Sequence, residues 1–469
     1  MLESITEPER STPVSHRADV IVAGAGVTGV CAAVASARAG ADTLLVERHA
    51  FPGGTSTAGL MSGITNFFFT GKNQRVVRGI PQEIVELLQE RGGAARGTFN
   101  SSVPQIPNDP EVMKLVLIEL LEDSGVRTLY HTTVAGAKTS SGRLTHLVVE
   151  NKSGRRALAG TVFVDATGDA DLVHLAGGEV ENVNPNGSLE IRMCNVDIDG
   201  LLEYLKAHPD EYDDYGDVPT SLADCISNWQ RIGIFHLPHG NGTKLSIVQD
   251  AIERGEYSRV FGVIHGLDAF GMYGLGINNT MIVNTGFVNG DLLDPDTLSR
   301  AEIDARRAAR LAADFLVNKM PGFSKSYMAD TGAEIGIRMT RRIIGNYTLT
   351  RDESEAYSRF DDVIAVATER IAGGPRYEEG FDIPYRILLP GGVEGILVGS
   401  GKCVSTDPPG LLRGQVACMQ MGQVCGIAAA HCASNSELPS RVDIRQVQAR
   451  LLGQDVFLGN GERLSQLGL

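Results

Sequence analysis

The chain has 469 residues, 42% of them apolar and 21% charged, and it carries a formal net charge of −15 at pH 7. This length exceeds what a single hydrophobic core normally supports, so two domains are expected. The negative charge argues against nucleic acid and anionic membrane surfaces as main partners. The seven cysteines include no C-x-x-C pair, which is typical of reduced thiols in a cytoplasmic protein.

Neither the N-terminal residues nor the most apolar segment of the chain predicts a targeting signal or a membrane span. Residues 1–17 contain acidic residues and proline and lack an apolar run, so we expect a flexible arm and no secretory signal. The segment 415–433 is the most apolar, but it carries three glutamines and a histidine among small residues. It predicts a buried helix and no membrane insertion.

The stretch ADVIVAGAGVTGV at 18–30 predicts the opening unit of a nucleotide-binding fold. A strand at 19–23 leads into a glycine turn and a helix of small residues. Gly24 allows the tight turn, Gly26 lets the backbone approach a pyrophosphate, and Gly29 lets the helix pack on the strand. The phosphates are then expected on the N–H groups at the helix N-terminus.

The residues after this unit indicate which nucleotide is bound. Glu47 ends a second predicted strand, where it is placed to bind ribose hydroxyls and disfavours the 2′-phosphate of NADP. The doublet Gly53–Gly54 then favours FAD over NAD. An NAD dehydrogenase has no general need for this turn, whereas FAD needs a backbone with little side-chain bulk beside its ribityl chain and ring.

Two later segments also favour FAD. A buried strand within 161–177 ends in Ala-Thr-Gly-Asp at 166–169, where the backbone would pass the adenosine end. The strand and loop of 395–415 lead to a helix that starts near 413–415. A helix N-terminus beneath the N1 and C2=O atoms of the flavin would stabilise the negative charge of the reduced ring. The sequence therefore predicts FAD.

The predicted FAD is bound non-covalently. Covalent attachment through His49 is an alternative, but His49 follows the adenine-side Glu47 too closely to reach the ring. The residues predicted to contact the cofactor are Gly24, Gly26, Val27, Thr28, Gly29, Glu47, Arg48, Gly53, Gly54, Thr55, Ser56, Thr57, Val134, Ala166, Thr167, Gly168, Gly401, Asp407, Leu412 and Arg413.

Several motifs resemble a known family. Residues 47–59 match the pattern E-x-x-x-x-x-G-G-x-x-T-A-G, and FDIPYRILLP at 381–390 matches a late pattern D-I-P-Y-R-x-L-L-P. On these motifs the chain, from about 18 to 435, resembles a bacterial group of FAD-dependent oxidoreductases of the glutathione-reductase-like flavoprotein class. It is more distantly similar to the flavoproteins of fumarate reductase and succinate dehydrogenase.

The resemblance implies an α/β fold. A Rossmann-like FAD-binding domain, with a parallel sheet and a β-meander crossover, would carry an inserted α+β substrate domain. We expect a flexible arm and two discontinuous domains. The FAD-binding domain comprises 18–70, 106–182 and 380–469, and the substrate or cap domain comprises 71–105 and 183–379.

The candidate catalytic residues lie mainly in the substrate domain. Arg338, Arg341 and Arg342 would share one face if the segment is helical, and could bind a substrate carboxylate or form structural ion pairs. His236 and His239 are a candidate pair of proton acceptors, or ordinary loop histidines, and no further ligands suggest a metal. Tyr385 would support the sheet or approach the flavin, and Asp407 would touch the substrate or the ribityl chain.

Other classes of enzyme fit less well. A disulfide reductase needs a redox cysteine pair and a second G-x-G-x-x-G, and a short-chain dehydrogenase needs Tyr-x-x-x-Lys; the sequence has none of these. A flavin monooxygenase usually has a Gly-Asp-Ala turn near the ribityl chain, where Lys402 follows Gly401 here. We expect a dehydrogenase or oxidase that transfers hydride between a small, anionic substrate and flavin N5. The alternatives are a monooxygenase and a non-catalytic flavin-binding protein.

Overall fold

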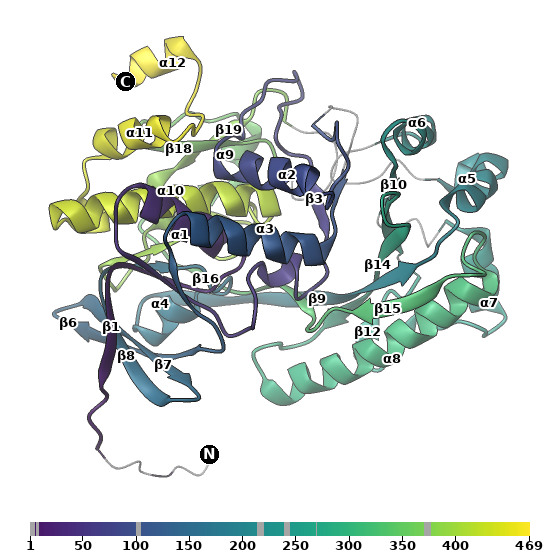
Figure 1. Ribbon diagram of the computed structural model, residues 1–469, viewed down its shortest axis with the longest axis horizontal. Helices are drawn as coiled ribbons and strands as arrows, with labels where there is room; N and C mark the ends of the chain where they lie inside the picture. Colours follow the sequence, from purple (N-terminus) through teal and green to yellow (C-terminus); the bar gives the residue numbers. More distant parts are fainter. Residues whose placement is uncertain are drawn as a thin grey trace.

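Two β-sheets, each with its own hydrophobic core, organise the protein (Figure 1). The computed structural model describes residues 5, 9–99, 105–212, 220–238, 244–268, 270–369 and 377–469, with the backbone alone at 184 and 185. The predicted α/β fold with a Rossmann-like domain is confirmed.

The first sheet is the expected nucleotide-binding sheet. Its order is β5-β2-β1-β8-β7-β6, and β20 pairs with β8 beyond the end of β7. Pairing is parallel among β5, β2, β1, β8 and β20, whereas β6, β7 and β8 form the predicted antiparallel meander. The strands are β1 (Val14–Ala23), β2 (Thr43–Val46), β5 (Arg127–Leu129), β6 (Thr133–Ser140), β7 (Arg143–Asn151), β8 (Gly154–Asp165) and β20 (Ile396–Val398).

Strand β1 begins earlier than the sequence indicated. The predicted arm ended at Arg17, but β1 starts at Val14. The reason is that β8 is long enough to supply partners, since Val14 pairs with Ala157 and Arg17 pairs with Ala159. Residues 14–17 therefore belong to the sheet.

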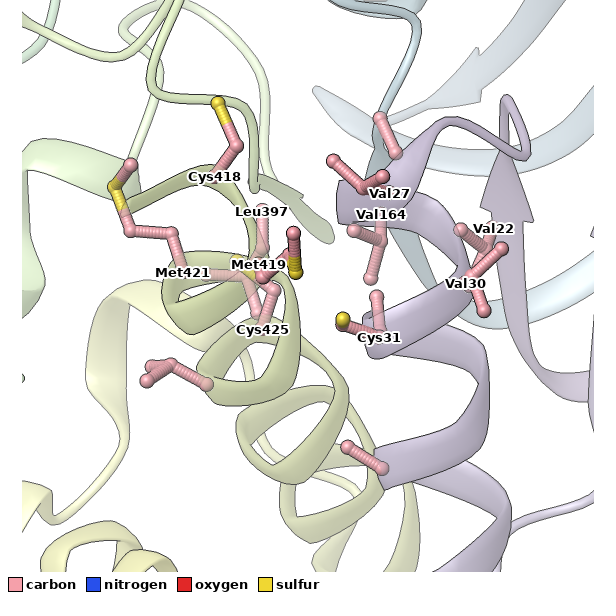
Figure 2. Packing of buried hydrophobic residues seen from close by; sticks show 14 of the residues in the cluster. Val22, Val27, Val30, Cys31, Val164, Leu397, Cys418, Met419, Met421 and Cys425 are labelled. Atoms are coloured by element: carbon pink, nitrogen blue, oxygen red, sulfur yellow. The ribbon is translucent and has the colours of Figure 1, made fainter. Parts of the chain in front are cut away.

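Helices α1 (Val27–Arg38) and α10 (Gln415–Asn435) pack directly on each other (Figure 2). A Cβ built on Gly422 would lie 2.2 Å from the carbonyl oxygen of Thr28, and one on Gly426 would lie 2.1 Å from that of Ala32. In Figure 2, Cys31 of α1 faces α10. Glycine is thus required at both positions for the helices to approach this closely.

Helix α10 is the one described helix that is long and apolar enough to cross a membrane. Its apolar window is 94% buried inside the protein. The helix therefore forms part of the core, as its small residues and glutamines predicted.

Smaller elements surround this core. Further helices are α2 (Ile80–Glu90), α3 (Pro110–Asp123), α4 (Asp171–Leu175), α9 (Arg351–Glu355), α11 (Ile444–Gly453) and α12 (Gly461–Leu467). Strand pairs are β3 (Gly63–Thr65) with β4 (Gln105–Pro107), β17 (Leu349–Thr350) with β21 (Thr406–Asp407), and β18 (Val363–Ala367) with β19 (Phe381–Pro384).

The second sheet is antiparallel and lies in the segment predicted to form the substrate domain, which stays a prediction. It contains β9 (Val180–Cys194), β10 (Ile234–Leu237), β11 (Val260–Phe261), β12 (Ile264–His265), β13 (Gly271–Leu275), β14 (Thr280–Asn289), β15 (Tyr327–Thr331) and β16 (Gly336–Ile343). Helix α8 (Pro295–Lys319) packs against it, and α5 (Ile198–Ala207), α6 (Leu222–Ile232) and α7 (Ser246–Glu253) complete the domain. Strand β9 runs from the first core into the second (Figure 1).

The close contact between α1 and α10 yields a stability prediction. Gly426→Val should lower the free energy of unfolding by about 1–3 kcal/mol, because the added side chain must push the backbone of α1 away. The measurement is urea unfolding followed by circular dichroism. Gly453→Val in α11 is the control, since a Cβ there meets nothing within 4 Å. Equal stability of the two variants would contradict the packing described.

Candidate active site

A cavity of about 570 Å³ opens at the carboxyl ends of the parallel strands, where ligands of such sheets bind. One wall comes from the glycine turn after β1, the ends of β2 and β8, and the start of α10. The opposite wall comes from the substrate domain, including Leu298, Ile335 and Ile337. The cavity therefore lies between the two domains.

Close backbone crossings shape its inner wall. Gly24 has a φ of +95°, and a Cβ there would lie 2.7 Å from the carbonyl oxygen of Ala166. A Cβ on Gly29 would lie 1.8 Å from the carbonyl oxygen of Gly24. Gly53 donates its N–H to the carbonyl of Ala25 at 2.7 Å. Three separate segments thus contact one another through backbone atoms, without side chains between them. This leaves room for an extended cofactor.

Two helix N-termini open into this cavity. Gly26 precedes α1 and Gly414 precedes α10, and neither helix has a side-chain cap on its first N–H groups. A Cβ on Gly26 would meet nothing within 4 Å, although Gly26 lines the cavity. Such N-termini attract negative charge. They fit the pyrophosphate and the reduced ring of FAD.

Glu47 is held in place by the loops that surround it. It is buried, and its two carboxylate oxygens accept N–H groups from Ala25 at 2.6 Å and His49 at 2.8 Å. Each oxygen has a second lone pair, and Glu47 lines the cavity. The carboxylate can therefore accept ribose hydroxyls, as the sequence predicted.

A contact between two distant segments of the chain lies in the cavity lining. Glu334 of the substrate domain pairs with Arg48, and lies 3.3 Å from Nε2 of His49. Burial raises the pKa of Glu334, but its hydrogen bond to His49 and the charge of Arg48 outweigh this and hold the pKa below its usual range. Glu334 is thus an ionised link between the domains.

The Ala-Thr-Gly turn after β8 is fixed by a buried carboxyl group. Asp165 accepts hydrogen bonds from the N–H and hydroxyl of Thr167, at 3.0 and 2.6 Å, and from the N–H of Val173. Burial raises the pKa of Asp165 to about 6. Nearby, Asp169 accepts the N–H of Thr340 at 2.8 Å and lies 3.6 Å from Nζ of Lys402. These contacts tie the turn to β16.

Most of the predicted cofactor residues line this cavity. They are Gly24, Gly26, Val27, Thr28, Glu47, Arg48, Gly53, Gly54, Thr55, Val134, Ala166, Thr167, Gly168 and Arg413. Their roles as FAD contacts remain predictions, but the structure brings them together from five separate segments of the chain.

The other predicted cofactor residues lie outside the lining. Ser56 donates to Oε1 of Gln415 at 2.9 Å, and Thr57 donates to the carbonyl of Pro52 at 2.8 Å. Gly29 and Gly401 are packing positions, because a Cβ on Gly401 would lie 1.7 Å from the carbonyl oxygen of Leu412. Leu412 is fully buried, and Asp407 is exposed in β21, where it pairs with Thr350.

Several lining residues were not predicted. They include Thr132, Thr133, Asp171, Glu334, Lys402, Gln415 and Cys418. Gln415 begins the helix whose start the sequence had placed at 413–415, so its position could have been inferred. Glu334 had no local signal, because it reaches the cavity only through the domain arrangement.

The arginine cluster lies on strand β16, so the condition that the segment is helical is not met. Pairing of β16 with β9 is interrupted by two register shifts, so the three arginines do not share a helical face. Arg341 pairs with Asp171 at 2.8 Å, and Arg342 pairs with Glu181. Arg338 donates to Oδ1 of Asn186 at 3.2 Å, and its guanidinium lies 4.7 Å from the ring centre of Phe287. Arg341 and Arg342 thus make the ion pairs considered as the alternative.

The remaining catalytic candidates have different surroundings. His236 lies in β10 rather than in a loop and is buried opposite Tyr273 in register. His239 lies outside the described residues. Tyr385 is buried away from the cavity lining and donates to the carbonyl of Pro439 at 3.0 Å. Its position fits the structural role considered for it.

The sequence did not predict a buried hydrogen-bonded pair formed by Tyr273 and Glu190. Tyr273 of β13 donates a hydrogen bond to Oε2 of Glu190 on β9. The two residues are far apart in sequence, and only the pairing of β9, β14 and β13 brings them together.

Comparison with known proteins identifies the family. The model of the FAD dependent oxidoreductase family matches residues 19–451. The chain therefore belongs to this family, and it is an oxidoreductase that uses FAD. No curated protein matches the chain.

Solved structures of low identity resemble it over most of their length. A geranylgeranyl bacteriochlorophyll reductase-like protein from Thermoplasma acidophilum is 12% identical, over 94% of this chain and 84% of that one, with a TM-score of 0.47. The myxobacterial chondrochloren halogenase CndH is 13% identical, over 93% and 78%, with a TM-score of 0.45. The p-nitrophenol 4-monooxygenase PnpA from Pseudomonas putida DLL-E4 is 9% identical, over 96% and 92%, with a TM-score of 0.43.

The open space at Gly26 allows a test of the cofactor site. Gly26→Val should leave folding intact, because its Cβ meets no atom within 4 Å and its φ is −61°. The side chain would occupy the space in front of α1, so the affinity for FAD should fall about 100-fold, or about 2.8 kcal/mol. Quenching of flavin fluorescence on titration of the apoprotein measures this.

Gly461→Val is the control for the Gly26 substitution, because a Cβ there also meets nothing within 4 Å and lies far along the chain in α12. Urea unfolding of both apoproteins checks that they are equally stable. Unchanged FAD affinity in Gly26→Val would show that the cofactor does not lie against the N-terminus of α1.

Proposed function

We propose that the protein is a dehydrogenase or oxidase with non-covalent FAD, and that its substrate is a small organic anion. FAD, when bound, supplies the acceptor of a hydride at N5. The observation that carries the proposal is the first turn of α10. It meets the cavity without a side-chain cap, beside Arg413, which has no carboxylate partner among the residues that the structure describes.

The first turn of α10 is rigidly held. Gln415 donates its Nε2–H to the carbonyl of Met61 at 2.8 Å and accepts the hydroxyl of Ser56 at 2.9 Å. These bonds fix the turn against the loop that follows Gly54. The N–H groups of this turn are therefore preorganised for negative charge, and a hydride transfer places that charge on the reduced ring.

Arg413 supports an anionic substrate. Its side chain is half-buried and lines the cavity next to Gln415. Within the described ranges, its guanidinium makes no ion pair or hydrogen bond with another side chain. A guanidinium in such a position binds carboxylates in bidentate fashion. Arg341 and Arg342 already form ion pairs with Asp171 and Glu181. We therefore assign the binding of the substrate anion to Arg413 instead.

The proposal predicts flavin reduction without a nicotinamide. Small carboxylates that carry an alcohol or amine group should bleach the flavin of the purified holoenzyme under anaerobic conditions. Arg413→Ala should raise the substrate concentration for half-maximal bleaching about 10- to 100-fold, because a hydrogen bond to a charged group is lost.

Arg310→Ala is the matched control, since Arg310 is exposed on α8 and pairs with Asp314. It should leave the substrate requirement unchanged. Bleaching only by NADH or NADPH, followed by consumption of oxygen, would contradict the proposal and favour a monooxygenase. No reduction by any donor would favour a non-catalytic flavin protein.

A further inference from the structure

The second sheet has one apolar face and one polar face. On β9, Leu189, Ile191 and Met193 enter the core that α8 covers. Alternate residues of a strand point to opposite faces, so Ser188, Glu190 and Arg192 point to the other side. In the register of the sheet, Asn284 stands beside Glu190, and His236 stands beside Tyr273. This polar face comprises Ser188, Glu190, Arg192, His236, Tyr273 and Asn284.

Glu190 is the buried acid at the centre of the polar face. Its exposed fraction is 1%, and its Oε2 accepts the hydroxyl of Tyr273. Its Oε1 has no hydrogen-bond partner among the described residues. A buried carboxyl oxygen without a partner is costly, and such groups are uncommon away from functional sites. Glu190 therefore has one oxygen available for a ligand or a proton.

Contacts link Glu190 to the cavity wall. The hydroxyl of Tyr273 lies 3.4 Å from Sδ of Met61, and the carbonyl of Met61 accepts Nε2 of Gln415, which lines the cavity. From the other side, the N–H of Gly332 donates to the backbone carbonyl of Glu190 at 3.0 Å. Gly332 lies two residues before Glu334 of the lining. Glu190 is thus linked to the cavity lining through Met61 on one side and Gly332 on the other.

A second set of polar atoms without partners lies at the strand pair of β3 and β4, which packs near Tyr273. In the described structure, Oγ of Ser62 and Oε1 of Gln105 are buried and make no hydrogen bond. A Cβ on Gly63 would lie 3.0 Å from Oε1 of Gln105 and 3.1 Å from the ring of Tyr273. The antiparallel pair of β3 and β4 therefore brings these polar atoms close to the same tyrosine that binds Glu190.

We propose that the substrate's reacting alcohol or amine binds between the polar face and the β3–β4 strand pair, and that Glu190 exchanges a proton with it. Tyr273 is a positioning residue that holds Oε2 and leaves Oε1 for the substrate. The inference rests on the proposed function, and it narrows the substrate to a small acid that carries a C–OH or C–NH group.

The proposed step balances as a two-electron oxidation. The proton of the substrate's O–H or N–H bond moves to the carboxylate of Glu190. The electron pair of that bond forms the new C=O or C=N bond, and the C–H bond breaks with its electron pair as a hydride that FAD accepts. Glu190 ends as the carboxylic acid, and the substrate ends two electrons more oxidised.

The protonation of Glu190 fits this role. Burial raises its pKa to about 8, and the hydrogen bond from Tyr273 and the charge of Arg338 on β16 only partly oppose this effect. On the same face, Asn284 of β14 is uncharged and stands beside Glu190, Arg192 pairs with Asp330, and His236 stands beside Tyr273. The ionised form, which accepts a proton, therefore grows as pH rises through about 8, and substrate oxidation should accelerate over the same range.

Glu190→Gln in the holoenzyme tests the inference with two readouts. Anaerobic bleaching by a substrate should slow by about 100-fold or more, and its increase through pH 8 should disappear.

Unfolding in urea gives a readout independent of activity. The folded-state pKa of about 8 lies above the ordinary value of 4.5, so wild-type stability should fall as pH rises between these values. The variant should lack this loss.

Two further variants sharpen the test. Tyr273→Phe removes a hydrogen bond that favours the ionised form, so the pH midpoint of bleaching should move upward while folding is kept. Glu181→Gln is the control on the same strand, where the carboxylate pairs with Arg342 instead. It should keep the wild-type rate and the wild-type pH midpoint.

The outcomes separate the inference from the proposed function. If substrate bleaches the wild type and Glu190→Gln reacts at the same rate with the same pH profile, the inference is overturned and the proposed function stands. If no small acid bleaches the wild type without a nicotinamide, the proposed function fails, and the inference fails with it. Both the inference and the proposed function would be supported if the pH dependence of bleaching is lost in Glu190→Gln and its pH midpoint moves upward in Tyr273→Phe.

Discussion

The arrangement of the active site depends on the close approach of α1 and α10. Gly422 and Gly426 let α10 lie against the backbone of Thr28 and Ala32, with no room for a Cβ. Because the helices touch so closely, their N-terminal ends open into one cavity. Two helix N-termini in one cavity favour a ligand with negative charge at separated points, which FAD has in its pyrophosphate and in its reduced ring.

The second sheet contributes the wall of the cavity that the nucleotide fold does not provide. Strand β9 runs from one core to the other, and the bond from Thr340 to Asp169 and the pairing of Arg48 with Glu334 hold the domains together at the cavity. The sheet then places its apolar face on α8 and its polar face toward the β3–β4 strand pair. On that polar face the buried Glu190 accepts the hydroxyl of Tyr273 at one oxygen, and its other oxygen has no partner among the described residues.

The sequence predicted the nucleotide-binding half well, because its chemistry is local. The turn at Gly24, the acid at Glu47 and the family motifs are each readable over a few residues. The substrate half was predicted poorly for the opposite reason. The arginines near 338 fit a helical spacing, but pairing with β9 makes the segment a strand. Glu190 and Tyr273 meet only across three strands, so no local pattern could reveal them.

The most direct test of this account is to precipitate the purified protein with acid and to quantify the flavin in the supernatant by mass spectrometry. The account predicts FAD in the supernatant, in a one-to-one ratio with the chain. A flavin that stays in the precipitate would contradict non-covalent binding and would direct attention to His49. A protein that contains no flavin, and is stabilised against heat by NAD, would contradict the placement of FAD between the two helix N-termini.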